Sequence, residues 1–307
     1  MFFYIIRRIL VAIPLMFGLV AIVFFLLRTL VPGDPAVILA GENATVELIE
    51  QVRRAQGLDK PLPEQFAIFV GNVLKGDLGR SSSTRQPVVE RIALALPTTA
   101  ALTLSTFLYS FSVGLFLGII TAYWRDSWLD NTLRVVTIFG ASMPTFWLGP
   151  MLMLLFAIIL GWLPAQGSLS LRGLILPTIT LGTGAAAELS RLVRGSMLEV
   201  LSSDYIRTAR SKGLAEKAVV IRHALSNALI PVVTIAAAQI GGLLGGAVIT
   251  ESIFGLPGIG TLSINAINDR DYAVIQGTVL FICGIYLFVN LLADITYAFI
   301  DPRIRIS

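Results

Sequence analysis

Long stretches without a charged residue constrain this chain more than any other feature of its sequence. Six such stretches occur, at residues 9–27, 92–124, 135–171, 173–187, 223–250 and 272–293. A helix of about 20 apolar residues spans the hydrocarbon core of a bilayer. Charged residues make up 14% of the chain and its mean hydropathy is +0.82, a balance that a water-soluble domain does not tolerate. The sequence therefore predicts an all-α, polytopic membrane protein with six transmembrane helices.

The positions of lysine and arginine predict the orientation of these helices. Short cytoplasmic loops are enriched in basic residues. An N-terminus placed inside puts most of them on the cytoplasmic flanks, and the two short outer loops then carry only Arg172 and Arg270. We therefore expect a multi-pass protein of the bacterial inner membrane, with both termini in the cytoplasm.

The spans divide the chain into three parts. Residues 1–30 form an N-terminal anchor helix, because the apolar stretch is too long for a secretory signal and no small-residue cleavage site follows it. Residues 31–97, the outer segment, are polar and periplasmic, with one amphipathic helix ending at Gly57 and a second opening at Pro63. This segment either caps the outer mouth, meets a partner, or rests on the headgroups as a connector. Residues 98–298 form a core of five helices.

Several residues inside the spans predict bends and close contacts. Pro144 and Pro150 break the hydrogen-bond ladder of the third span, so we expect a kink there. Small residues spaced by four let helices approach closely, either within the bundle or at a subunit seam. The glycines with this spacing are Gly114, Gly118, Gly241, Gly242, Gly245 and Gly246.

Two carboxylates lie near the inner ends of spans, Glu188 in the fourth and Asp294 in the sixth. A charge at this depth is costly unless it pairs or faces water, so each is a candidate for a pathway or gate. Glu188 precedes Arg191 by three residues on a helix, which favours a structural ion pair instead. These carboxylates also leave open a secondary transporter or channel driven by an ion gradient.

Other chemistry finds no support in the sequence. The single cysteine, Cys283, and the single histidine, His223, make neither a disulfide framework nor a metal site. No catalytic set of side chains shares a face, and the dispersed basic residues do not form a nucleic-acid surface. No Gly-Lys-Ser or Gly-Lys-Thr phosphate loop occurs, so we expect neither catalysis nor a cofactor in this chain.

The longest cytoplasmic loop, at about residues 195–226, is both basic and prone to form helices. Asp204 is expected to cap a helix that stops at Gly213, and a further helix follows from Glu216. Such a hairpin, held along the membrane, suits docking on an acidic or phosphate-bearing surface. The same residues also satisfy the positive-inside rule, so composition alone leaves both interpretations open.

The residues of this loop resemble the coupling loop of ABC import permeases of the dipeptide and oligopeptide type. The run Asp-Tyr-Ile-Arg-Thr-Ala-Arg-Ser-Lys-Gly-Leu stands at residues 204–214, and Arg-His-Ala-Leu-Ser-Asn-Ala-Leu-Ile-Pro at 222–231. Arg207, Thr208 and Ala209 occupy the Glu-Ala-Ala positions of the wider superfamily, and Gly213 its glycine. Val-Pro-Gly-Asp-Pro-Ala at 31–36, Leu-Pro-Thr-Ile-Thr-Leu-Gly at 176–182 and Glu-Ser-Ile-Phe-Gly-Leu-Pro-Gly-Ile-Gly at 251–260 are similar to further landmarks of that branch.

The resemblance implies a division of labour among subunits. A second, similar permease completes the pathway, two cytoplasmic ATPase subunits bind ATP and magnesium, and an extracytoplasmic binding protein delivers the solute. Members of the family carry dipeptides, longer peptides, glutathione, nickel complexes or glycosides. The residues expected to contact the ATPase are Asp204, Tyr205, Arg207, Thr208, Ala209, Gly213, Leu214 and Leu225.

Overall fold

Helices account for nearly all of the regular structure in this computed structural model, which describes residues 2–30, 34–41, 44–55 and 57–300. Within these ranges the only extended pairing is an isolated bridge between Arg80 and Pro87. A helix satisfies its backbone hydrogen bonds within one segment, which is what a chain surrounded by lipid requires. The expected all-α fold is confirmed for the described residues.

The elements follow one another in a simple order. The N-terminal part holds α1 (Phe2–Leu30), α2 (Pro35–Ala40), α3 (Val46–Ala55) and α4 (Leu62–Leu74). The middle holds α5 (Val88–Tyr123), α6 (Trp128–Ser142), α7 (Thr145–Leu152), the π-helical segment η1 (Met153–Ile159) and α8 (Leu171–Leu201). The last part holds α9 (Asp204–Ser211), α10 (Glu216–Ala218), the π-helical segment η2 (Val219–Ala224), α11 (Leu225–Phe254), α12 (Ile259–Asn268) and α13 (Tyr272–Ile300).

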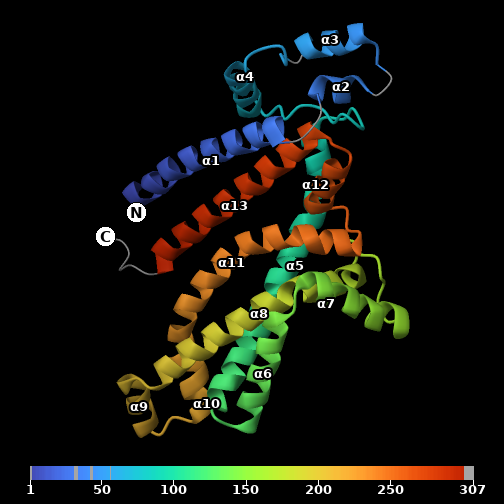
Figure 1. Ribbon diagram of the computed structural model, residues 1–307. Helices are drawn as coiled ribbons and strands as arrows, with labels where there is room; N and C mark the ends of the chain where they lie inside the picture. Colours follow the sequence, from blue (N-terminus) through green and yellow to red (C-terminus); the bar gives the residue numbers. More distant parts are fainter. Residues whose placement is uncertain (1, 31–33, 42–43, 56, 301–307) are drawn as a thin grey trace.

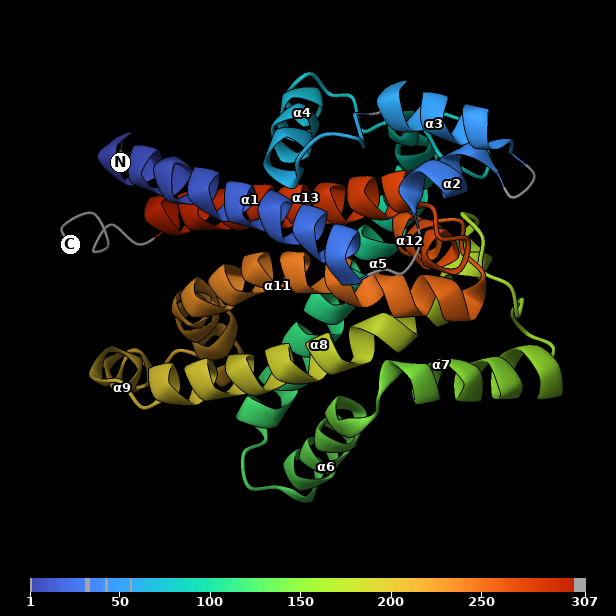
Figure 2. The ribbon, with the colours of Figure 1, turned by 45° about the horizontal axis from the view of Figure 1, so that its top comes forward.

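The long helices pack in a layered bundle. The most extensive contact joins α5 to α8, and α11 packs against α8, α5 and α13. The N-terminal helix α1 lies along α13, at one edge of the bundle (Figure 1, Figure 2). The core positions therefore come from helices that are far apart in the sequence.

Among the residues that the structure describes, four helices are long and apolar enough to cross a membrane: α1, α5, α11 and α13. A fifth span is possible if α6 and the α7–η1 segment, which are bent by 106° at their junction, form one broken span. The long helix α8 contains the predicted stretch 173–187 but also carries five charged side chains, and it is not among these candidates. Four of the six predicted spans thus correspond to helices that can cross a membrane, and the other two spans stay a prediction.

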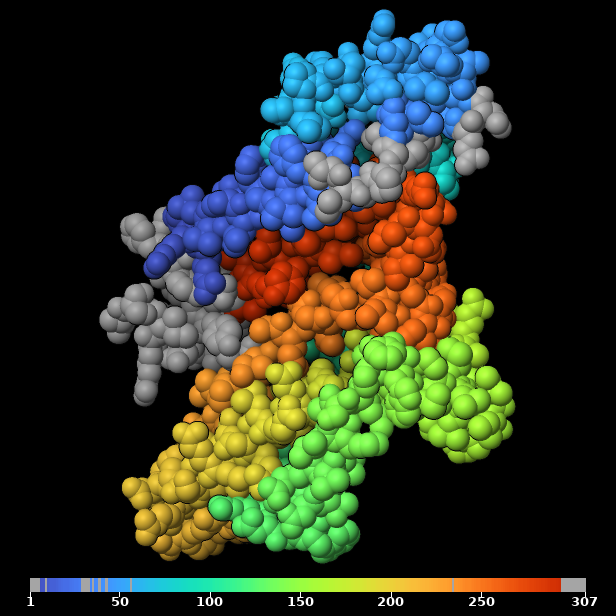
Figure 3. All heavy atoms as spheres, in the orientation of Figure 1, coloured from blue at the N-terminus to red at the C-terminus, as the bar shows by residue number. Residues whose placement is uncertain are grey.

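The short helices and the ends of the long helices gather at two opposite ends of the bundle. The first turns of α1, the last turns of α13 and all of α9 lie at one end of the bundle, whereas α2, α3 and α12 lie at the other (Figure 2). In the space-filling view, the blue lobe formed by α2–α4 stands on the end opposite α9 (Figure 3). The described ends of α1 and α13 thus lie at the same end of the bundle as α9, and the side of the membrane on which they lie stays a prediction.

The outer segment contains the two short helices that the sequence predicts. Gly57 follows α3 with a φ of +65°, and Pro63 lies in the first turn of α4. The aromatic rings of Phe66 and Phe69 pack against the buried Phe24 of α1, with ring centroids 5.4 Å apart in each pair. These contacts hold α4 on the outer end of the anchor helix.

The predicted kink in the third span is far sharper than a proline alone explains. Pro144 precedes the first residue of α7, and the 106° bend falls at this point, whereas Pro150 is accommodated inside α7. The residue before a proline disfavours the helical region, and Met143 is extended with a ψ of 120°. The chain therefore leaves the helix at Met143 and starts a new one in another direction.

Candidate functional site

The candidate site is the hairpin formed by residues 204–225, here called the coupling hairpin. It consists of α9, a turn at Gly213, α10 and η2, and it protrudes at one end of the molecule (Figure 1). Gly213 has a φ of +78°, which a glycine adopts without penalty. No other atom lies within 4 Å of the Cβ that a larger residue would place there, so backbone conformation explains the glycine.

The coupling hairpin is built on the core of the bundle rather than attached by a loose loop. Ile206 and Val219 are fully buried, and Ala224 is as well. They belong to one apolar cluster that continues into α5, α8 and α11, with the members Ala122, Leu189, Val193, Met197, Ile206, Ala209, Val219, Val220, Ala224, Ala228, Val232 and Ala236. The hairpin is therefore packed into the same apolar cluster as α8 and α11.

An ion pair closes the hairpin across its turn. The Arg210 guanidinium donates to both carboxylate oxygens of Glu216, with Nη2 to Oε1 at 2.6 Å and Nε to Oε2 at 3.1 Å. This hydrogen-bonded pairing lowers the pKa of the Glu216 carboxyl below its ordinary value of 4.5. Tyr205 adds a second link, because its hydroxyl accepts a hydrogen bond from Asn227 Nδ2 at 3.0 Å.

The residues expected to contact an ATPase divide into two groups. Asp204, Tyr205, Arg207, Thr208, Gly213 and Leu214 are exposed on the hairpin. Ala209 is buried and Leu225 is half-buried, so both pack the hairpin against the bundle and present little surface. The exposed face is polar, with Arg207 and Asp204 forming an exposed pair at 3.4 Å.

One local expectation about the hairpin needs correction. Asp204 does not cap α9, because it already lies in the first turn, and the N-cap position is taken by Ser203, whose backbone is extended. The Ser203 hydroxyl donates to the Val200 carbonyl instead of capping the helix. The helix predicted from Glu216 is present, and it continues through η2 directly into α11.

The expected pair between Glu188 and Arg191 is absent among the ion pairs of the described residues. Glu188 Oε2 instead accepts a hydrogen bond from Gln239 Nε2 on α11, at 3.1 Å. Both Glu188 and Arg191 are exposed on α8. Asp294 lies on α13, but its side chain is outside the part of the molecule that the structure describes.

One buried ion pair was not anticipated from the sequence. Asp130, at the start of α6, is fully buried, and both its oxygens accept hydrogen bonds from Arg194 of α8, at 3.1 and 2.8 Å. Ser127 caps the same helix through the Asp130 backbone N–H. This pair ties α6 to α8 near the coupling hairpin.

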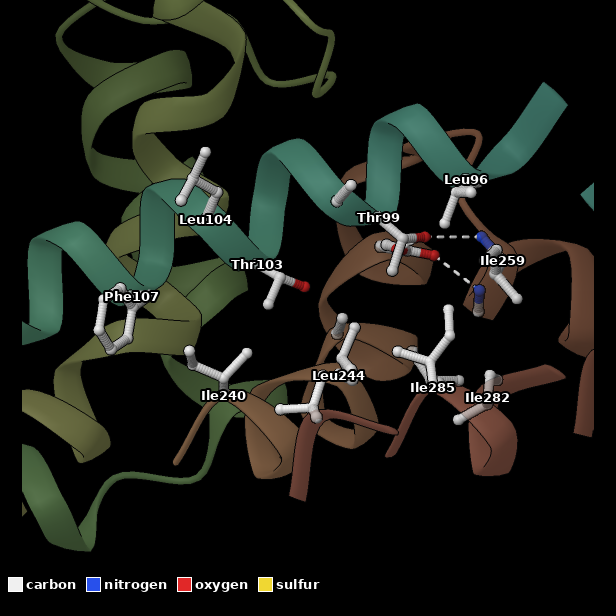
Figure 4. A pocket seen from close by; sticks show the side chains of 16 residues that line it. Leu96, Thr99, Thr103, Leu104, Phe107, Ile240, Leu244, Ile259, Ile282 and Ile285 are labelled. Carbon is white, nitrogen blue, oxygen red and sulfur yellow. Dashed lines mark hydrogen bonds between the residues drawn. The ribbon is translucent and has the colours of Figure 1, made fainter. Parts of the chain in front are cut away.

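A second unanticipated carboxylate, Glu251, lies at the far end of α11. It is fully buried and accepts hydrogen bonds from the Thr99 hydroxyl at 2.6 Å and from the Gly260 N–H at 2.8 Å. Thr99 accepts in turn from the Ile259 N–H at 2.9 Å (Figure 4). The carboxylate thereby holds the first turn of α12 against α5 and α11.

An apolar cavity of about 300 Å³ adjoins Glu251, between α5, α11, α12 and α13. Its walls are mainly aliphatic, and the Thr103 hydroxyl, which has no hydrogen-bond partner, points into it (Figure 4). The family landmark at residues 251–260 thus builds one end of this cavity. The landmark at 31–36 is described from Asp34 onward, where Asp34 Oδ1 accepts from the Ala36 N–H and caps α2.

Known proteins resemble this chain over almost its whole length. Residues 114–306 match the model of the family described as "Binding-protein-dependent transport system inner membrane component", and residues 1–103 match the model of its N-terminal region. The glutathione transport system permease protein GsiC of Pectobacterium atrosepticum is 44% identical over 98% of both chains. The protein of the same name from Escherichia coli K12 is 42% identical, also over 98% of both chains.

Solved structures share the fold. The MetNI methionine ABC transporter, in an inward-facing form, aligns with a TM-score of 0.59 and 20% identity, covering 68% of this chain and 96% of that chain. An amino acid ABC transporter structure aligns with a TM-score of 0.51 and 15% identity, covering 70% of this chain and 94% of that chain. Together with the family models and the relatives, these matches show that the chain belongs to the inner-membrane permease components of binding-protein-dependent ABC import systems, of the dipeptide and oligopeptide type.

Proposed function

We propose that this chain forms, with a second permease subunit, the translocation pathway of an ATP-driven importer. The observation that carries the proposal is the coupling hairpin: an exposed polar turn whose buried side belongs to the same apolar cluster as α5, α8 and α11. A surface built in this way suits docking of a separate subunit. The absence of a phosphate loop from the sequence agrees with an energy source in that subunit.

The hairpin offers a direct route from ATPase movement to the bundle. Two ATPase subunits closing on ATP would displace the hairpin as a rigid body, because its turn is locked by Arg210 and Glu216. The buried side of the hairpin would carry α8 and α11 with it. The bundle would thereby alternate between inward-open and outward-open arrangements.

The same proposal fixes the sides of the membrane. The hairpin and both chain ends face the cytoplasm, and the outer segment faces the periplasm, where a binding protein delivers the solute. The segregation of α9 from α2–α4 at opposite ends supports this topology. We propose peptides or related small solutes as the cargo, and relatives named as glutathione permeases support a solute of tripeptide size.

An ion-gradient-driven transporter or channel is the alternative from another class. It depended on Glu188 and Asp294 as carboxylates in a pathway. Glu188 bonds to Gln239, and nothing in the described ranges of the chain connects it to a further titratable group. No observation on these residues favours the alternative.

Charge reversal on the hairpin tests the proposal. The Arg207 side chain is 76% exposed, so Arg207→Glu should leave folding intact while it disrupts an ATPase contact. We expect at least a tenfold loss of ATP-dependent uptake in vesicles that contain the chain with its partner permease, ATPases and binding protein.

The matched control is Arg125→Glu in the turn between α5 and α6, outside the hairpin, where the Arg125 side chain is 63% exposed. Uptake should stay near the wild-type level in this variant. Equal uptake by Arg207→Glu and wild type, at equal protein content, would remove the hairpin from the mechanism.

A further inference from the structure

A second cavity, of about 480 Å³, lies at the end of the molecule opposite the coupling hairpin. Its walls come from the outer end of α1, from α3 and α4, from the loop that follows α4, and from the start of α13 (Figure 1). Cavities of roughly 300–1,000 Å³ are the size that accommodates small molecules. Unlike the cavity beside Glu251, this one has a mixed lining, with polar side chains along one part and apolar side chains along the rest.

Positive charge dominates the lining. Arg28, Arg80 and Arg85 line the cavity, against the single carboxylate of Asp77. Within the described residues, none of the three arginines has a carboxylate oxygen within 4 Å, and Asp77 is engaged by the Gly79 N–H at 2.8 Å. A guanidinium presents a fixed fork of donors that matches a carboxylate. Asp34 attracts Arg28 electrostatically without forming an ion pair, and Arg80 Nη1 donates to the Arg85 carbonyl at 3.4 Å. The other guanidinium donors of the lining are left for an anion from outside the chain.

Two buried polar atoms on the same walls have no hydrogen-bond partner, the Tyr272 hydroxyl and the Gln65 Oε1. The Gln65 amide orientation is set by Nε2, which donates to the carbonyls of Leu58 at 3.2 Å and Lys60 at 2.8 Å. Its Oε1 is therefore an acceptor that lacks a donor. Leaving such a buried atom unpaired is costly, so the site favours an occupant that brings an N–H group.

The remaining wall is apolar. Phe24 and Phe69 line the cavity beside Ile68, and Arg28 stacks over the Phe24 ring at 5.5 Å from its centroid. An inorganic anion makes no use of this wall, whereas an organic anion buries apolar surface on it. The lining as a whole is complementary to a molecule that combines a carboxylate, an N–H donor and an apolar group.

We propose that this cavity binds the carboxyl end of a short, peptide-like solute. Arg28 and Arg80 hold its carboxylate, Gln65 Oε1 accepts one of its N–H groups, and its apolar side chain packs on Phe24 and Phe69. The site is distant from the coupling hairpin. Its occupancy does not depend on the function proposed above, because binding belongs to this chain alone.

The full-length chain in nanodiscs of phosphatidylcholine tests this proposal by isothermal titration calorimetry. The probes are N-acetyl-leucyl-glycine, with a free carboxylate, and the same dipeptide with a C-terminal amide. We expect the carboxylate form to bind, and the amide form to bind at least about tenfold more weakly, since it loses the charge-assisted hydrogen bonds. Inorganic phosphate and nanodiscs containing phosphatidylglycerol serve as competing anion sources.

Three variants locate the binding. Arg80 is exposed, so Arg80→Gln should fold normally and weaken binding of the free dipeptide about tenfold. Tyr272→Phe removes only the unpaired hydroxyl and should weaken binding of the free dipeptide by a smaller factor. Arg54→Gln makes the same charge change on the exposed face of α3, outside the cavity lining, and should bind like the wild type.

Four results would overturn the proposal. The first is no binding of the free dipeptide, which would leave the cavity to water. The second is equal affinity for the dipeptide and its amide, and the third is unchanged affinity of a folded Arg80→Gln variant for the free dipeptide. The fourth is displacement of the bound dipeptide by phosphate or phosphatidylglycerol at equal concentration. The last result would assign the arginines to a phosphate or lipid headgroup instead.

Discussion

Buried carboxylates show how single residues organise this chain. Asp130 joins α6 to α8 through Arg194, and Glu251 fixes α12 through Thr99. Asp271, which directly precedes α13, accepts a hydrogen bond from the Ser81 hydroxyl of the outer segment. All three carboxylates are fully buried. Each therefore requires a partner at its own position, and each finds it on a different element.

These pairings could not be predicted from the sequence for a physical reason. The partners are separated by 64, 152 and 190 residues along the chain, and only tertiary packing brings them together. The sequence indicates Glu188 as a candidate because this residue interrupts an apolar stretch. Glu251 stands directly after an apolar stretch, where a charged residue is expected at the end of a span. The left-handed glycine at Gly213 was predictable, because a turn after a helix requires it.

At the residue scale, the Glu216 carboxylate makes the hairpin sensitive to acid. Arg210 lowers the pKa of Glu216 in the folded chain, so its stabilising contribution is present above the ordinary pKa of 4.5 and is lost as the pH falls through the lowered value. Both side chains are more than 40% exposed, so we expect about 0.5 kcal/mol. A spin label on Ser211→Cys, in a chain with Cys283→Ala, should keep its mobility above about pH 4.5 and become more mobile as the pH falls further.

The control for this titration is Glu216→Gln, which cannot ionise. Its spin label should be more mobile at neutral pH and should change little on acidification. A wild-type hairpin that keeps the same mobility throughout this range would show that the ion pair does not hold the turn.

At the scale of elements, the sequence predicted where helices occur better than how they meet. The apolar stretches placed α1, α5, α11 and α13, and local turn residues placed α3 and α4. The short helix α12 was missed, because its ten residues form no long apolar run and depend on Glu251 for their position. Pro144 predicted a break but not its angle of 106°, since packing sets the direction of α7.

The most extensive helix contact, between α5 and α8, depends on glycine. A Cβ at Gly118 would lie 2.5 Å from the Cβ of Val193 and 2.8 Å from the carbonyl oxygen of Ser190. Gly118→Ala must therefore push the helices apart, and we expect a loss of about 1–3 kcal/mol in the free energy of unfolding. Denaturant unfolding of the purified chain in detergent, followed by circular dichroism, measures this change.

Gly245→Ala on α11 is the matched control, because no atom lies within 4 Å of its added Cβ. Alanine is the better helix former, so this variant should be neutral or more stable by about 0.5–1 kcal/mol. Equal stability of Gly118→Ala and the wild type would show that the α5–α8 contact can relax without cost.

At the scale of the whole molecule, polar functions lie at the two ends and apolar packing lies between them. The coupling hairpin stands at one end and the outer segment with its arginine-lined cavity at the other (Figure 3). The sequence predicted this polarity through the distribution of basic residues. It could not predict the cavity, whose lining comes from five separate parts of the chain.

The proposed mechanism requires that a separate ATPase supplies the force and that this chain performs no hydrolysis itself. Uptake of a labelled peptide into vesicles tests this most directly, with this chain reconstituted alone or together with its partner permease, ATPases and binding protein. The account predicts uptake by the complete set in the presence of ATP, and none by this chain alone. Uptake or ATP hydrolysis by the purified chain alone would contradict it.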